Sequence, residues 1–232
     1  PTIDTAGLNS FDRAELSIML PWAPVRRVIG ELFSDRGYKI ADPPAPYGLE
    51  GSVRWIKAIA QALGMESGAL ERVEETIAAK KHKLEAMRRA AGEYRLAFVM
   101  RGEFVKDLTQ PEFFFGLDPL ALLHEFGFAT EIFSIGPAHG ASELALPDSV
   151  TLTELDAEVD IVEALKNSAC RLVYSDRPRN ALVSAAGKTA FDIGDILPGL
   201  SGAEKTLRLL LTKARMDFYS RYGAYLTGRS HE

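Results

Sequence analysis

Residues 43–60 read PPAPYGLEGSVRWIKAIA, and this stretch decides how the chain is organised. Its three prolines hold the backbone extended, because each proline fixes its own φ and lacks an N–H donor. An amphipathic helix then begins at Gly48. Its apolar face consists of Leu49, Val53, Ile56, Ala60 and Leu63. A rigid, extended segment that leads into such a helix is typical of a chain passing from one α/β domain into the next.

The residues before this stretch predict one strand–helix–strand unit. A buried strand is expected over Leu16–Leu20, a short helix over Val25–Phe33 and a second strand over Tyr38–Ala41. A unit of this size cannot bury both faces of a sheet. We therefore expect residues 1–42 to be the partial end of a preceding α/β domain.

Two helices, over about residues 49–63 and 67–91, follow the prolines. The second has a narrow apolar face and heavily charged other faces, as in a long connector that lies across a domain surface. Its basic run, residues 80–83, is expected to be a solvated face. Residues 43–92 are thus predicted to be a proline-rich linker and two connecting helices.

From Tyr94 onward, strands and helices alternate. Strands are predicted over residues 95–100, 130–135, 171–174 and 188–193, with helices between and after them. Two of these helices are expected to open with capping boxes, at Thr151–Glu154 and Ser201–Glu204. Such alternation predicts a parallel sheet covered by helices on both faces. The predicted fold class is therefore α/β, with a Rossmann-like parallel sheet in residues 93–232 and the partial second unit and connecting helices before it.

Composition excludes several classes of function. The 232-residue chain has a net charge of −5 and its basic residues are spread out, which argues against a nucleic-acid interface. No apolar run is long enough to span a membrane and residues 1–10 do not resemble a signal peptide, so we expect a cytoplasmic protein. The only cysteine is Cys170, which we expect to be an inert core thiol, and it allows no internal disulfide and no cysteine-held cluster.

Candidate binding residues come from the loops that follow the predicted strands. Ligands of open parallel sheets bind beyond the carboxyl ends of the strands, and these four loops are rich in glycine and charge. The candidates for binding a substrate or cofactor are Arg101, Gly102, Glu103, His139, Ser175, Arg177, Asp192 and Asp195. No catalytic residue and no metal ligand is predicted, since the four histidines lack the spacing of a metal site.

Two other motifs have simple structural interpretations. The sequence Gly187-Lys188-Thr189 precedes a strand and lacks the earlier glycine of a phosphate-binding loop, so it predicts no nucleotide site. The run Phe113-Phe114-Phe115 predicts a loop packed onto an apolar surface or onto a partner, with ligand stacking as the less favoured alternative.

Nearly the whole chain resembles the C-terminal half of nitrogenase component 1-type proteins. Three features carry the resemblance: residues 45–55 (APYGLEGSVRW), the long charged helix over 71–89 that leads into a strand, and the ending FDIGDILPGLSG at residues 191–202. The group includes nitrogenase subunits, their cofactor-assembly scaffolds and the subunits of protochlorophyllide and chlorophyllide reductases. The resemblance implies Rossmann-like domains, a paired component 1-type subunit and an ATP-dependent iron–sulfur reductase as partners.

The resemblance also bears on cofactors. It implies that cluster cysteines lie in an N-terminal domain or in a partner, so this chain is expected to hold no cofactor itself. Residues 192–202 contain no histidine, which argues against a metallocofactor bound as in nitrogenase. The chain is therefore expected to form one wall of a substrate or cofactor cavity and part of a subunit interface, and to be inactive alone. A cofactor-assembly scaffold of the same fold and a non-redox small-molecule binding module remain alternatives.

Overall fold

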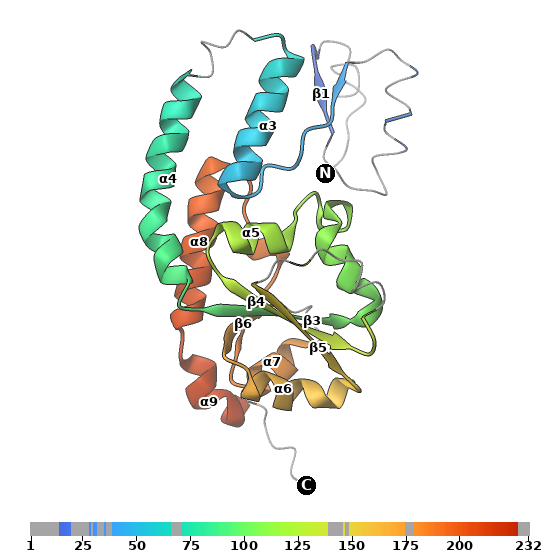
Figure 1. The fold of residues 1–232 in the computed structure, drawn as a ribbon, viewed down its shortest axis with the longest axis vertical. Helices are drawn as coiled ribbons and strands as arrows, with labels where there is room; N and C mark the ends of the chain where they lie inside the picture. The colour runs from blue at the N-terminus through green and yellow to red at the C-terminus, as the bar shows by residue number, and fades with distance from the viewer. Residues whose placement is uncertain are drawn as a thin grey trace.

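The computed structural model describes residues 14–19, 28, 30, 31, 35, 39–65, 71–138, 146, 149–174 and 179–226. Figure 1 shows a central sheet between two layers of helices, with a pair of long helices extending upward beside α8. The sheet consists of β3 (Arg95–Arg101), β4 (Ala129–Ile135), β5 (Val150–Leu155), β6 (Cys170–Tyr174) and β7 (Thr189–Phe191). All neighbouring strands are parallel, in the order β5-β4-β3-β6-β7. The predicted Rossmann-like α/β architecture is confirmed.

Strand alternation divides the core into two halves. Leu96 and Phe98 of β3 face the layer formed by α4 (Glu71–Ala91), α5 (Pro119–Glu125) and α8 (Leu200–Arg215). Ala97 and Val99 face the opposite layer, formed by α6 (Ile161–Asn167) and α7 (Asn180–Ala185). Successive side chains of a strand point to opposite faces, so a near-continuous apolar run is what a sheet covered on both sides requires. A last helix, α9 (Phe218–Leu226), packs beside α7.

The capping box predicted at Thr151–Glu154 is wrong, because these residues lie within the edge strand β5. The sequence of β5, VTLTEL, begins with alternating apolar and β-branched polar residues, a pattern of period two that suits an edge strand. A 3-10 turn, η6 (Glu158–Asp160), follows, and the helix starts only at Ile161. The sheet therefore has one strand more than the sequence predicted.

The second capping box, at Ser201–Glu204, is also wrong. The N-cap of helix α8 lies two residues earlier than predicted, at Gly199 with φ 84°, a conformation that glycine adopts readily. Glu204 is turned away from the helix start and its carboxylate lies 2.9 Å from Lys80 Nζ and 2.7 Å from Lys83 Nζ. These two lysines lower the pKa of Glu204 to about 2. The basic run of α4 is thus only partly a solvated face, since two of its lysines join α4 to α8.

Before the main sheet, β1 (Ser17–Ile18) and β2 (Ile40–Ala41) form a two-stranded parallel sheet. This pair agrees with the two strands predicted in residues 15–42. An extended proline segment follows β2 and leads into α3 (Gly48–Ala62), as the opening stretch predicted.

Helices α3 and α8 begin in the same way. Each has a buried glycine in its first turn, and each glycine packs on the carbonyl of the extended segment before its helix. A Cβ on Gly51 would lie 3.0 Å from the Ala45 oxygen, and one on Gly202 would lie 2.4 Å from the Leu197 oxygen. The two starts also touch, since Gly199 N donates a 2.6 Å hydrogen bond to Pro46 O. The sequences of residues 46–52 (PYGLEGS) and 198–203 (PGLSGA) are similar. This similarity therefore reflects a shared way of starting a helix after an extended segment.

Candidate functional site

The sheet has one point where the strand order reverses. From β3 the chain adds β4 and β5 on one side, and then returns to add β6 and β7 on the other side of β3. The connections after β3 and β6 therefore leave the sheet in opposite directions, which opens a crevice at the carboxyl ends of these two strands. Arg101 ends β3 and Tyr174 ends β6.

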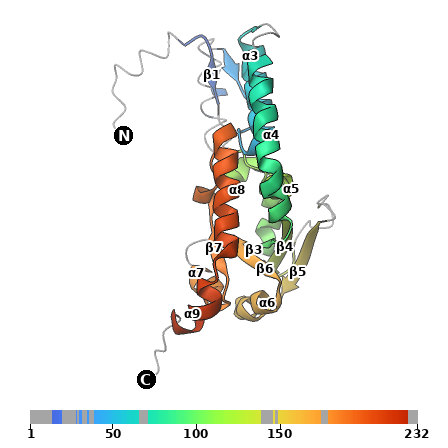
Figure 2. The same ribbon diagram turned by 90° about the vertical axis from the view of Figure 1, so that its left-hand side faces the viewer.

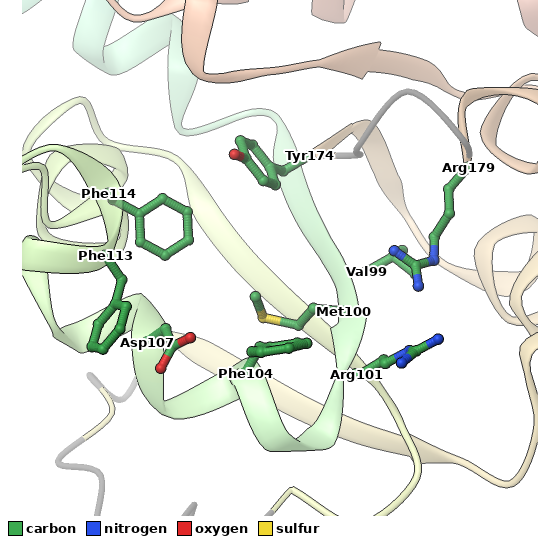
Figure 3. A pocket seen from close by; sticks show the side chains of 9 residues that line it. All are labelled: Val99, Met100, Arg101, Phe104, Asp107, Phe113, Phe114, Tyr174 and Arg179. Atoms are coloured by element: carbon green, nitrogen blue, oxygen red, sulfur yellow. The ribbon is translucent and has the colours of Figure 1, made fainter. Parts of the chain in front are cut away.

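A cavity of about 440 Å³ lies at this point, and Figure 3 shows its lining. We call it the switch-point cavity. Its walls come from the end of β3, the two 3-10 segments η3 (Gly102–Thr109) and η4 (Pro111–Phe114), the end of β6 and the start of α7. The lining residues are Val99, Met100, Arg101, Phe104, Asp107, Phe113, Phe114, Tyr174 and Arg179. The volume is in the range of about 300–1,000 Å³ that is usual for small-molecule sites.

One wall of the cavity is aromatic and anchored in the core. The ring centroid of Tyr174 lies 5.3 Å from that of Phe98 and 5.5 Å from that of Phe191, both buried, and 6.2 Å from that of Phe114. By contrast, Phe104 and Phe113 are 48% and 55% exposed. Exposed phenylalanine rings beside a packed aromatic cluster give a flat ligand an apolar surface on which to stack.

Two arginines line the side of the cavity away from Phe113 and Phe114. Figure 3 shows Arg101 and Arg179 on one side, with Phe113, Phe114 and Asp107 across from them. The Arg179 side chain is 15% exposed and its Nε donates a 3.1 Å hydrogen bond to Glu158 of η6. Arg101 is 63% exposed and 4.0 Å from the Glu103 carboxylate, a loose pair. Guanidinium groups on one side of a cavity, with their planar donor geometry, suit a carboxylate or phosphate.

Asp107 is the acidic residue of the cavity lining. Burial raises its pKa, and the neighbouring Lys106 and Glu112 act in opposite directions, the lysine lowering it and the glutamate raising it. The charged groups of the cavity are thus separated, with the two arginines at one side and Asp107, whose pKa is raised, at the other.

The predicted site residues fall into three groups. Arg101 lines the cavity, and Gly102 and Glu103 follow it in η3, where Gly102 is buried and Glu103 is exposed. Asp192 and Asp195 do not line the cavity, because they lie after β7 and close the turn η8 (Ile193–Asp195). His139, Ser175 and Arg177 lie outside the described residues.

Gly102 has a structural role next to the site. A Cβ there would lie 1.9 Å from the Pro137 carbonyl oxygen, so only glycine lets the loop after β3 pass this close to the loop after β4. This contact fixes the direction in which η3 leaves the sheet, and η3 carries Phe104 and Asp107.

Sequence reasoning missed most of the aromatic and charged lining. Phe104 and Arg179 lie within the strand-end loops predicted from the sequence to bind a ligand, but the predicted residues in these two loops are Arg101, Gly102, Glu103, Ser175 and Arg177. Phe113 and Phe114 were assigned mainly to packing, whereas both line the cavity. Tyr174 was read as the last residue of a buried strand, and only the strand order places it at the switch point.

The described residues do not fit an iron–sulfur cluster. Cys170 is the first residue of β6, at the opposite end from Tyr174, and its thiol is buried. Burial raises the pKa of this thiol, which opposes the thiolate that a cluster needs. Within the described ranges, no three His, Cys, Asp or Glu side chains are grouped to hold a metal ion. The same residues include no helix that is long and apolar enough to cross a membrane.

No protein-family model matches the sequence, and no curated protein matches it either.

Proposed function

We propose that this chain is the C-terminal region of a nitrogenase component 1-type oxidoreductase subunit, and that its switch-point cavity forms one wall of the substrate or cofactor site. The observation that carries the proposal is the pairing of exposed aromatic rings with two arginines at the point where the strand order reverses. The resemblance of residues 45–55 and 191–202 to that group supplies the reaction class.

The ligand that this geometry favours is flat, largely apolar and anionic. Phe104 and Phe113 offer apolar surface to its body, and Arg101 and Arg179 lie where an acidic group would be held. This chain would bind and orient the ligand and shield part of it from water. Electrons would come from an ATP-dependent iron–sulfur reductase through a cluster held outside the described residues, with a paired component 1-type subunit completing the site.

A binding experiment tests the site. The probe is 1-pyrenecarboxylate, a flat fluorescent anion, with 1-pyrenemethanol as its uncharged counterpart. We expect the carboxylate to bind more tightly than the alcohol, and Phe113→Ala and Arg179→Gln each to weaken carboxylate binding. The matched control is Phe218→Ala, which removes a ring of similar exposure, 49%, from α9 outside the cavity. Equal binding of both probes, or equal loss in the control, would contradict the assignment of the site.

A turnover experiment separates the proposed oxidoreductase from its alternatives. The protein is combined with a paired component 1-type subunit and an ATP-dependent iron–sulfur reductase, and oxidation of the reductase is followed by its visible absorbance. An oxidoreductase subunit predicts oxidation that requires ATP and every component. Ligand binding without oxidation would favour an assembly scaffold or a non-redox binding module and would overturn the proposed activity.

A further inference from the structure

A second cavity, of about 310 Å³, lies where α3, α4 and the carboxyl end of α5 meet. We call it the three-helix cavity. Figure 1 shows these helices above the sheet, and the cavity shares no lining residue with the switch-point cavity. The apolar part of its lining comes from all three elements and consists of Leu49, Val53, Ile77, Leu84 and Phe126. This surface would bury an apolar chain of modest length.

Cationic side chains line the rest of the three-helix cavity. They are Arg54 of α3 with Lys81 and Arg88 of α4. Arg54 and Lys81 are exposed, and neither forms an ion pair with another described residue. Arg88 has a distant ion pair with Glu85, at 3.6 Å, but its buried Nε has no hydrogen-bond partner among the described residues. Arg54 and Lys81 are therefore the basic groups of the lining without an ion-pair partner among the described residues, whereas the Arg88 charge acts on Glu125 and lowers its pKa, against the larger effect of burial.

Two acidic residues, Glu50 and Glu125, also line the cavity, and they differ in how far they offset its positive charge. Glu125 is committed to the start of α3, since its Oε1 accepts hydrogen bonds from the backbone N–H of Leu49 at 2.6 Å and of Glu50 at 3.3 Å. A carboxylate at a helix N-terminus is stabilised by the unpaired amides and the helix dipole. The side chain of Glu50 is exposed to solvent. The charge left for a ligand is thus positive.

We propose that the three-helix cavity binds a small amphiphile that has one apolar chain and one carboxylate head group. The chain lies on Leu49, Val53 and Leu84, and the carboxylate lies between Arg54 and Lys81. The volume, at the low end of the usual range for small-molecule sites, limits the ligand to a short chain. The cavity is independent of the proposed redox function, because its lining lies on the linker helices and α5.

The test uses octanoate, with octylamine as a probe of the same chain length and opposite charge, in calorimetric titrations of the whole protein. We expect octanoate to bind with a dissociation constant on the order of 1 mM and octylamine to bind at least tenfold more weakly. Lys81→Gln should weaken octanoate binding by about two- to fivefold. The matched control Lys166→Gln removes an exposed lysine from α6, outside the cavity, and should change nothing.

Val53→Trp fills the cavity and should abolish octanoate binding while circular dichroism stays unchanged. If that variant does not fold, the comparison of octanoate affinity between Lys81→Gln and Lys166→Gln still tests the proposal. Equal affinity for octanoate and octylamine, or no binding by the parent protein, would overturn the proposal. The same holds if Val53→Trp changes the sedimentation mass, because the cavity would then be a contact between copies of the chain. Phe113→Ala should leave octanoate binding intact, so failure at the switch-point cavity is distinguishable from failure here.

Discussion

The switch-point cavity, at the ends of β3 and β6, and the turn after β7 lie at the same edge of the sheet, yet they use their polar groups differently. After β7, Asp192 accepts a 2.7 Å hydrogen bond from Gly194 N, and Asp195 accepts one of 3.0 Å from Asp192 N. Asp195 also lies 2.5 Å from Lys213 Nζ of α8. The turn after β7 satisfies its own carboxylates, whereas the end of β3, η3, η4, Tyr174 and Arg179 surround a cavity with exposed rings and two arginines. An edge that the fold makes suitable for binding therefore becomes a site where exposed groups remain, here the Phe104 and Phe113 rings and the loosely paired Arg101.

The largest expected effect comes from the close approach that shapes the cavity. Gly102→Ala places a Cβ against the Pro137 carbonyl oxygen, a backbone atom that cannot move away alone. We expect the free energy of unfolding to fall by about 2–4 kcal/mol, measured by urea denaturation, together with weaker binding of 1-pyrenecarboxylate. Gly92→Ala is the control, since its Cβ would meet its nearest neighbour, the Arg89 carbonyl oxygen, at 3.4 Å. An unchanged stability of the Gly102 variant would show that this contact does not fix η3.

A smaller effect is expected after β7, where Asp195 should contribute to the stability of the fold and not to ligand binding. Asp195→Ala removes the hydrogen bond to Asp192 N and the partner of Lys213. We expect a loss of about 1–3 kcal/mol in the free energy of unfolding and no change in 1-pyrenecarboxylate affinity at a temperature where the variant is folded. If Asp195→Ala weakened 1-pyrenecarboxylate binding without lowering the free energy of unfolding, Asp195 would belong to the binding site and not to the structural turn.

The smallest effect concerns Asp107, the acid of the cavity. Because burial raises its pKa, the folded state binds a proton more tightly than the unfolded state does. Its contribution to stability is therefore greatest at low pH and is lost as the pH rises from the ordinary carboxyl value through the raised one. Deprotonation also adds a negative charge, so the affinity for 1-pyrenesulfonate, a flat probe that stays anionic throughout the acidic range, should fall over the same pH window.

Asp107→Asn should remove this pH dependence of binding and stabilise the protein slightly at neutral pH. Fluorescence titrations of 1-pyrenesulfonate, whose charge does not change in this range, at a series of pH values give the comparison. The isosteric change Asp118→Asn is the control, because Asp118 caps α5 outside the cavity. A parent profile that is flat across the acidic range would contradict the placement of Asp107 in the cavity.

The sequence predicted the layered α/β fold because the apolar runs of β3, β4 and β6 are buried on both faces and leave an unambiguous pattern. Edge strand β5 was missed because its short alternating sequence also matches a helix-capping motif. The site was predicted only in part. Strand-end reasoning found Arg101, but strand order depends on long-range pairing that no local pattern encodes. Without that order, Tyr174 could not be placed next to Phe114, nor Asp195 be separated from the cavity.

The most direct test of the account is the affinity of 1-pyrenecarboxylate for the parent protein, Arg179→Gln and Asp195→Ala, measured side by side by fluorescence titration. Binding at the switch point predicts a clear loss of affinity in Arg179→Gln and parent-like affinity in Asp195→Ala. Parent-like affinity in Arg179→Gln, with a loss in Asp195→Ala, would place the ligand at the end of β7 and contradict the central claim.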